Sequence, residues 1–190
     1  LSAGGGIVIA YKGFEPGLIC RGYQFHMGKN VTDKANCRAN GFHCAEDPLD
    51  CLTYYPDMAH SEYYLVNAGG NVDEDDNDTK ISCTELTILQ RLDLQGLLLH
   101  ALAYMVDHPL RERNEHVHSD RGVADSGFAI VRGVAPVAKG QVDDYLAFAQ
   151  ESPDGRKILQ VAIIRVDGKT VQPNIWYNLD GVKEEVEVPC

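Results

Sequence analysis

The sequence predicts an α+β protein with two modules, a mixed module over residues 7–108 and an all-β module over residues 120–190. One extended pattern of helical periodicity covers Asp93–His108. Short β-branched and aromatic runs precede that pattern, and only strand-like runs separated by Gly, Pro or Asp follow it. A chain of 190 residues is long enough for one compact domain or for a domain with a small second module.

The N-terminal module is expected to begin with strands. Ile7–Tyr11 is short, apolar and β-branched, and residues 23–27 alternate aromatic or apolar side chains with polar ones. Residues 61–68 and 80–89 predict the two arms of an antiparallel hairpin, and the polar, acid-rich loop over 71–78 forms its tip.

Two helices are expected in the same module. Asp47 and Pro48 are the residue types that cap and open a helix, and Pro56 ends it. The longer helix follows Asp93, which also suits a cap, and Pro109 prevents its continuation. Apolar residues recur along it at helical spacing and predict a core-facing stripe: Leu94, Leu98, Ala101, Leu102 and Met105.

The residues after the long helix change character. Residues 109–122 are rich in charge and are expected to form a linker. Four strand-like runs follow: Gly127–Val131, Tyr145–Gln150, Ile158–Val166 and Ile175–Leu179. Residues 123–140 contain two short cycles of small and apolar residues that end in glycine. Such cycles suit either a short β-solenoid or roll, or a plain antiparallel meander.

Composition argues against several classes of function. The chain has 17 basic and 28 acidic side chains, and its formal charge is −11. A surface of this charge repels phosphate backbones and anionic lipids, so neither nucleic-acid binding nor membrane binding is expected. The six cysteines include no CxxC pair, so we expect no metal site, and reduced thiols in a cytoplasmic protein.

Residues 41–56, GFHCAEDPLDCLTYYP, are the strongest candidates for a pocket. Phe42, Tyr54 and Tyr55 would stack a ring-shaped ligand, and His43 would act as an acid or a base near neutral pH. Each residue also has a structural alternative. Aromatic side chains on a short helix pack in cores, and a half-buried imidazole bonds to a backbone group.

A single carboxylate completes the candidate site. Strand alternation places Glu85 on the face of Ile81 and Cys83, where an inward carboxylate is costly unless it is paired or functional. The alternative for Glu85 is a position at the rim of the sheet. The acidic residues 73–78 offer oxygen ligands for a divalent cation, but the spacing of an EF-hand is missing, which favours a solvated hairpin tip.

Four segments of the chain resemble a family of uncharacterised proteins from bacteriophages and prophages. These segments are YKGF at 11–14, CRGYQF at 20–25, GFHCAEDPLDCLTYYP at 41–56 and VDGKTVQPNIWYNLDG at 166–181. The resemblance spans most of the chain and implies no particular activity. It implies an accessory protein that is cytoplasmic in the bacterial host or associated with the virion.

The N-terminal part also resembles the ADP-ribosyltransferase fold. The resemblance rests on Tyr11-Lys12-Gly13, on Gly41-Phe42-His43 followed by Tyr54 or Tyr55, and on Glu85. It implies that the tyrosines stack the nicotinamide of NAD and that Glu85 steadies positive charge as the glycosidic bond opens. Lys12 stands where that fold carries Arg or His, so the planar fork that would orient a diphosphate is missing.

Two functions are therefore open. The first is a non-catalytic accessory protein without a cofactor, which binds a protein partner or associates with itself. The second is an ADP-ribosyltransferase-like enzyme, or a binder of an NAD derivative. The second function would use Tyr54, Tyr55 and Glu85, with Lys12 and His43 as further candidates, and it requires that Glu85, Tyr54 or Tyr55, and Lys12 converge on one cleft.

Overall fold

A computed structural model describes residues 7–33, 40–74 and 79–186 of the chain. Contacts between Cα atoms divide it into two compact units, Leu1–Leu97 and Leu98–Cys190. The boundary falls inside helix α2 (Leu94–Asp107), which is the long helix that the sequence predicts. Each unit has its own sheet and its own hydrophobic core.

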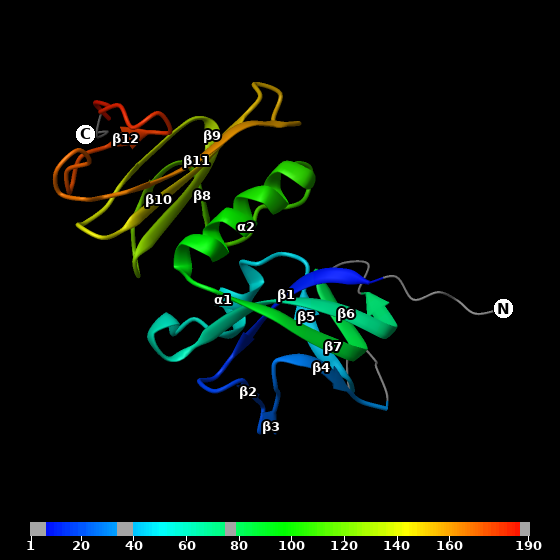
Figure 1. The fold of residues 1–190 in the computed structure, drawn as a ribbon. Coiled ribbons are helices and arrows are strands. Elements are labelled where there is room, and N and C mark those ends of the chain that lie inside the picture. Colours follow the sequence, from blue (N-terminus) through cyan, green and yellow to red (C-terminus); the bar gives the residue numbers. More distant parts are fainter. Residues whose placement is uncertain (1–6, 34–39, 75–78, 187–190) are drawn as a thin grey trace. The chain divides into compact units, whose positions relative to one another are not determined.

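A sheet that closes on itself forms the first unit (Figure 1). Its strands, in order, are β4 (Gly28–Val31), β7 (Lys80–Leu92), β5 (Phe42–Ala45), β1 (Val8–Phe14) and β6 (Glu62–Glu74). β6 also pairs with β7, so β7, β5, β1 and β6 complete a small antiparallel barrel. The hairpin of β6 and β7 is the one predicted from the sequence.

Short elements connect the barrel strands. The hairpin of β2 (Ile19–Cys20) and β3 (Tyr23–Gln24) follows β1. Helix α1 (Asp50–Tyr54) and a 3-10 turn (Met58–His60) connect β5 to β6. The carboxylate of Asp47 accepts a hydrogen bond from the amide two residues later at 2.9 Å, yet the helix itself starts only at the third residue after it.

Side chains from all four barrel strands fill the barrel interior. The buried cluster consists of Ala10, Phe14, Phe25, Phe42, Cys44, Tyr64, Val66, Ala68, Ile81, Cys83, Leu86 and Ile88. The ring of Phe14 meets the rings of Phe25 and Tyr64 edge-on, with centroids 5.3 and 5.5 Å away. Such pairs stabilise a core beyond the burial of apolar area. Protein side chains thus occupy the space around Phe42 that the sequence analysis assigns to a ligand.

A mixed sheet forms the second unit. β9 (Phe128–Lys139) pairs in parallel with β8 (Val117–Val123) and β10 (Tyr145–Glu151). β11 (Ile158–Arg165) is antiparallel to β10, and β12 (Tyr177–Asn178) is antiparallel to β9. β9 pairs with β10 and then with β12 along one side, and with β8 along the other side. Because β11 lies beyond β10, β11 and β8 are opposite edges of this sheet.

The core of the second unit is separate from that of the barrel. Its buried members are Ala129, Val131, Ala138, Leu146, Phe148, Val166, Val171, Tyr177 and Leu179. The hydroxyl of Tyr177 accepts a hydrogen bond from the Gln172 amide at 2.8 Å, so the polar end of this fully buried ring is satisfied.

The α+β prediction is wrong. Strands account for 50% of the residues and helices for 13%, and one of the two helices is short. The N-terminal module is a barrel because β6 and β7, with 13 residues each, extend well beyond the predicted hairpin arms. Their paired backbones supply most of the walls, and α1 contributes only one turn and a half.

The predictions for the C-terminal region also need correction. The sheet mixes parallel and antiparallel pairs, so it is neither a solenoid nor an antiparallel meander. A register shift between Ser119 and Arg121 also breaks the regular offset that stacked solenoid coils would need. The predicted linker over 109–122 contains most of β8, because an edge strand can expose polar and charged side chains to water.

Candidate functional site

Lys12 lies inside the barrel, where a charged side chain is unexpected. Lys12 lies on the same face of β1 as Ala10 and Phe14, and it is only 7% exposed. Its ammonium donates a hydrogen bond to the backbone oxygen of His43 at 2.7 Å. The nitrogen also lies 5.3 and 5.5 Å from the ring centroids of Phe14 and Phe25. Carbonyl and aromatic contacts therefore compensate part of the cost of burying this amine.

Cys20 and Tyr55 complete the surroundings of Lys12. The Lys12 nitrogen is 3.5 Å from the Cys20 sulfur, and the Tyr55 hydroxyl donates to the same sulfur at 3.2 Å. Burial, followed by the hydrogen bond to Cys20, raises the pKa of Tyr55, so its hydroxyl keeps its proton at neutral pH. The Tyr55 ring packs directly over Gly13, which leaves no room there for a Cβ atom.

The other described thiols of this unit are less accessible than Cys20. Cys20 is half-buried, whereas Cys44, Cys51 and Cys83 are buried. Burial raises the pKa of Cys51 to about 12. The hydrogen bond with Cys83, together with burial, raises the pKa of Cys44. Raised pKa values make both thiols poor nucleophiles near neutral pH.

The structure does not bring Glu85 to this cluster. Glu85 forms an ion pair with Lys29 at 2.8 Å, and its side chain is 37% exposed. The strand register places Lys12 beside Tyr64, and Tyr64 beside Arg91. Through β5, however, the register places His43, whose carbonyl Lys12 contacts, beside Ser82, only three positions from Glu85. The exposure of Glu85 and its ion pair with Lys29, not its distance along β7, keep it out of the cluster. Glu85 therefore has the rim position that the sequence left open, and not the inward one.

A bulge in β6 lies opposite Glu85. The β6–β7 register shifts between Gly69, which pairs with Glu85, and Val72, which pairs with Cys83. Gly70 has a φ of 69° and lies so close to Thr84 that a Cβ atom would collide with that side chain. The extra residue of this bulge lies in β6. Opposite it, the core positions of β7 change from Ile81 and Cys83 to Leu86 and Ile88, so Glu85 does not share their face.

Tyr54 is separated from the cluster as well. It is 59% exposed, so it forms no wall around a buried ligand. The structure therefore gathers Lys12, the backbone of His43, Phe42 and Tyr55 in or beside the barrel core, and leaves Glu85 and Tyr54 outside it. This arrangement does not favour the NAD-dependent mechanism, which needs the carboxylate and the tyrosines in one cleft.

A hollow with a volume of about 510 Å³ lies elsewhere in the first unit. It is bounded by the start of β6, the end of β7 and the first residues of α2, and Glu62, Tyr63, Arg91 and Asp93 are among its lining residues. Arg91 and Glu62 form an ion pair across it at 3.5 Å. None of the site residues predicted from the sequence lines this hollow.

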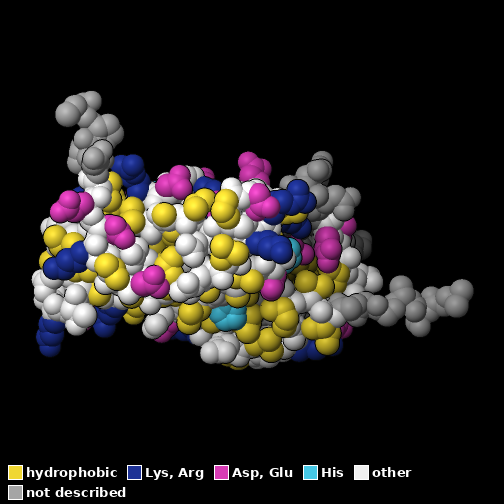
Figure 2. Space-filling view, turned by 90° about the horizontal axis from the view of Figure 1, so that it is seen from above, with side chains coloured by type: hydrophobic (Ala, Val, Ile, Leu, Met, Phe, Trp, Pro, Cys, Tyr) yellow, Lys and Arg dark blue, Asp and Glu magenta, His cyan; other side chains and the backbone are white. Residues whose placement is uncertain are grey.

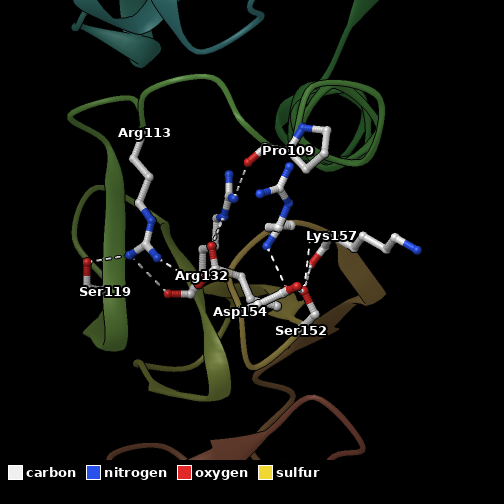
Figure 3. A network of polar contacts seen from close by, with 9 residues as sticks. Pro109, Arg113, Ser119, Arg132, Ser152, Asp154 and Lys157 are labelled. Atoms are coloured by element: carbon white, nitrogen blue, oxygen red, sulfur yellow. Dashed lines mark hydrogen bonds and ion pairs between the residues drawn. The ribbon is translucent and has the colours of Figure 1, made fainter.

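The second unit contains a buried ionic network that was not predicted from the sequence (Figure 3). Glu151 at the end of β10 accepts from Arg132 of β9 at 2.6 Å and from Arg113 at 2.8 Å. Both Arg132 and Glu151 are buried. Arg132 also donates to the Pro109 oxygen, and Arg113 to Ser119 of β8, both at 2.6 Å. The network thereby links β8, β9 and β10. A charged residue inside an apolar strand run, as in AIVRG, is the sequence signal that points to such a pair.

The turn between β10 and β11 continues from this network. Ser152 donates to Asp154 at 2.6 Å and accepts from the Lys157 amide at 3.0 Å. Asp154 also accepts from the Arg156 amide at 3.1 Å. Figure 3 shows Ser152, Asp154 and Lys157 next to the buried ion pair. The start of β11 is therefore fixed by hydrogen bonds as well as by the strand ladder.

β11 presents an apolar edge. Among the residues that the structure describes, it pairs with β10 alone. Leu159 is 58% exposed and Val161 39% exposed, and no charged residue occurs before Arg165 at the strand end. Figure 2 shows hydrophobic side chains reaching the surface among acidic and basic ones on the face in view. A long apolar edge is a template for pairing with another extended chain.

Two further observations concern ligands and membranes. Within residues 7–33, 40–74 and 79–186, no group of three or more His, Cys, Asp or Glu side chains is placed to hold a metal ion. In the same ranges, no helix combines the length and the apolar character that crossing a membrane requires. Residues 75–78, the rest of the acidic loop 73–78, lie outside the described residues.

Comparisons with known proteins give one match. Residues 8–100 match a family described as a domain of unknown function, DUF7666. This segment contains the whole barrel and the start of α2. No curated protein and no solved structure matches the chain. The match shows neither a bacteriophage origin nor similarity to ADP-ribosyltransferases, so both resemblances stay predictions.

Proposed function

We propose that this protein is a non-catalytic binding protein that docks an extended segment of a partner protein on the β11 edge of its second unit. The observation that carries the proposal is an apolar edge strand with one free side. Such an edge recognises a partner by main-chain hydrogen bonds, and its side chains select alternate residues of the added strand. This role agrees with the accessory function that the phage resemblance implies.

Backbone geometry supports strand addition over part of β11. The pairing with β10 is regular from Gln160 to Arg165, and the one bulge lies before it, at Leu159. Alternate residues of an edge strand direct their N–H and C=O groups outward. Six regular residues therefore offer enough hydrogen-bonding groups for a short peptide strand.

Charge indicates which partner segment fits. Arg156 and Lys157 precede β11, and Arg165, which forms an ion pair with Asp143 at 2.6 Å, ends it, although the chain as a whole carries a charge of −11. A partner strand with apolar residues in its centre and acidic residues at its ends would complement both features. Complementary charges at the rim raise the association rate and set the register.

The same charges disfavour a second copy of this chain as the partner. Two β11 strands related by a two-fold axis would run antiparallel, which places Lys157 of one copy near Arg165 of the other. Like charges at facing positions destabilise a strand pair. We therefore assign the edge to a different protein, and the oligomeric state is one outcome of the test.

The buried ionic network holds this edge in place before binding. Glu151 is the last residue of β10, and it pairs with Ile158 at the start of β11. Its ion pair with Arg132 and the Ser152 hydrogen bonds leave the neighbouring turn little freedom. A strand that is already ordered loses less conformational entropy when the partner binds.

A designed peptide pair tests the proposal. The probe alternates Val and Thr and carries two Glu at each end, and its control carries Lys in place of each Glu. Fluorescence anisotropy with the full chain should show binding of the acidic probe at least about tenfold tighter than that of the control. The difference should shrink in high salt, because the rim charges are exposed.

Two results would overturn the proposal. If the two peptides bind equally, or if neither binds, β11 is not a docking edge that selects its partner by charge. A concentration-dependent dimer in sedimentation, with β11 protected in the dimer, would instead assign the edge to a second copy.

A further inference from the structure

The Lys12 cluster is independent of the β11 edge and suggests chemistry of its own. A primary amine, a thiol and a phenol meet at one point, with the Cys20 sulfur 3.5 Å from the Lys12 nitrogen and 3.2 Å from the Tyr55 oxygen. Among the described residues, Lys12 forms no ion pair with a carboxylate. An amine within contact distance of an accessible thiol can capture that thiol once it is oxidised.

We propose that Lys12 and Cys20 form a modification site, in which a peroxide oxidises Cys20 and Lys12 captures it as a nitrogen–sulfur cross-link. In the first step the Cys20 sulfur attacks one oxygen of hydrogen peroxide, and the O–O bond breaks. The sulfur is oxidised by two electrons to a sulfenic acid, and the peroxide is reduced to water. Sulfenic acids are known to condense with nitrogen nucleophiles.

The second step uses the amine. The unprotonated Lys12 nitrogen attacks the sulfenic sulfur, the N–S bond forms and the S–O bond breaks. The departing hydroxide takes up the proton lost by the amine and leaves as water. In total, one peroxide and two protein hydrogens become two waters, so the protein loses the mass of two hydrogens.

The neighbours of the pair favour this outcome. The Tyr55 hydroxyl points at the sulfur and can relay the proton, donating its own to the departing oxygen and recovering the one that the Lys12 amine loses. The hydrogen bond to His43 and the rings of Phe14 and Phe25 hold the Lys12 nitrogen near the sulfur. Cys20 is half-buried, so a small peroxide reaches it more readily than it reaches the buried Cys44 or Cys51.

The link would join two strands of the barrel unit. Lys12 belongs to β1, and Cys20 ends β2, which pairs only with β3 among the described strands. Glu15 and Ile19 already close the intervening loop through backbone hydrogen bonds. A covalent link across this loop would tie the β2–β3 hairpin to the barrel, and a thiol reductant would release it.

Peptide mapping of the full chain after peroxide treatment at mildly alkaline pH gives a direct test. Trypsin normally cleaves after Lys12 and after Arg21. In the cross-linked chain, cleavage after Lys12 should be lost, and the peptide that ends at Arg21 should retain Lys12 and weigh two hydrogens less. Reduction with a thiol should restore both the cleavage and the mass.

The same map excludes a disulfide of equal mass change. Cys44 and Cys83 share a hydrogen bond, but trypsin places them in different peptides, 39–80 and 81–91. A disulfide would join those two peptides and leave cleavage after Lys12 intact. That result, without a modified peptide around Lys12, would overturn the proposal.

Two variants provide matched controls. Cys20→Ser should abolish the modified peptide while leaving the buried thiols unchanged. Lys12→Arg keeps a buried cation but removes the nucleophile, so oxidised Cys20 should appear with one or more added oxygens. If Lys12→Arg does not fold, fragmentation of the modified wild-type peptide locates the N–S bond. Added oxygen on Cys20 in the wild-type chain, with Lys12 still cleaved, would contradict the proposal.

Discussion

The two edges of the second sheet differ in the way they meet solvent. β8 exposes His118, Asp120 and Arg121, and its ladder is interrupted by a register shift with a φ of 62° at Asp120. β11 exposes Leu159 and Val161 and is regular over its last six residues. Charges and bulges are the devices that keep an edge strand from pairing with other chains. β8 has both devices, whereas the regular part of β11 has neither before its final arginine.

This difference identifies β11 as the edge that remains available for pairing. One sheet has the same backbone hydrogen-bonding groups at both edges, so backbone chemistry alone does not separate them. The two edges are distinguished by their side chains and by their local twist. The buried network of Arg113, Arg132 and Glu151 contacts Ser119 on β8 and the end of β10 beside β11, so its loss should affect both edges.

The largest effect is expected from Glu151→Ala, which removes the support shared by the two edges. The substitution leaves the buried Arg132 without its carboxylate, and the free energy of unfolding should fall by about 4 kcal/mol. Urea unfolding followed by circular dichroism measures this change. Glu115→Ala is the control, because the Glu115 side chain is 68% exposed and its loss should change stability by less than about 0.5 kcal/mol. Similar losses in both variants would refute the assigned role of the network.

Gly133→Ala should damage the β8 side selectively. A Cβ atom at Gly133 would collide with the Asp120 side chain and lie 3.0 Å from its Cα atom, so the β8 bulge must move. Overpacking of this kind typically destabilises by about 2 kcal/mol. Binding of the acidic probe at β11 should survive. If this variant loses probe binding while remaining folded, the two edges are not independent.

Val161→Lys should affect the β11 side in function rather than in stability. A lysine on an edge strand discourages pairing with another strand. Binding of the acidic-ended probe should weaken at least about tenfold, because the apolar centre of the peptide would face a charge. The matched control is Val123→Lys on β8, where the replaced side chain is 51% exposed. Anisotropy titrations of the two variants should differ, and equal affinities would count against β11 as the docking edge.

The smallest effect concerns the turn before β11. The hydrogen bond from Ser152, followed by that from the Arg156 amide, lowers the pKa of Asp154. Because the folded pKa lies below the unfolded one, the stabilisation is present above about pH 4 and is lost as pH falls through the folded pKa. Urea midpoints of the wild-type chain and of Asp154→Asn should differ slightly at pH 7 and converge in acid. A gap that persists unchanged in acid would show that the charge of Asp154 is irrelevant.

Local patterns predicted individual elements better than their assembly. The helix over Leu94–Asp107 and the β6–β7 hairpin follow directly from periodicity and from stop signals. β8 was missed because an edge strand tolerates the charged residues that also mark a linker. Barrel closure depends on register between strands distant in sequence, such as β1 with β6, and no local pattern reports that register.

In the candidate site, too, local patterns identify residues but not their assembly. Lys12, Phe42 and Tyr55 were identified from the sequence, and they do gather around the barrel core. Of the two positions open for Glu85, the structure has the one at the rim, because the core positions of β7 change from Ile81 and Cys83 to Leu86 and Ile88 opposite the Gly70 bulge of β6. The partners of Lys12, which are a thiol, a carbonyl and two rings, are brought together only by the closed barrel.

Hydrogen exchange with and without the acidic probe peptide tests the docking edge most directly. Mass spectrometry of the full chain should show slower exchange within Ile158–Arg165 when the peptide is present, because the outward amides of β11 gain hydrogen-bond partners. Exchange within Val117–Val123 should not change. Protection in β8, or no protection in β11 under conditions where the peptide is bound, would contradict the proposed function.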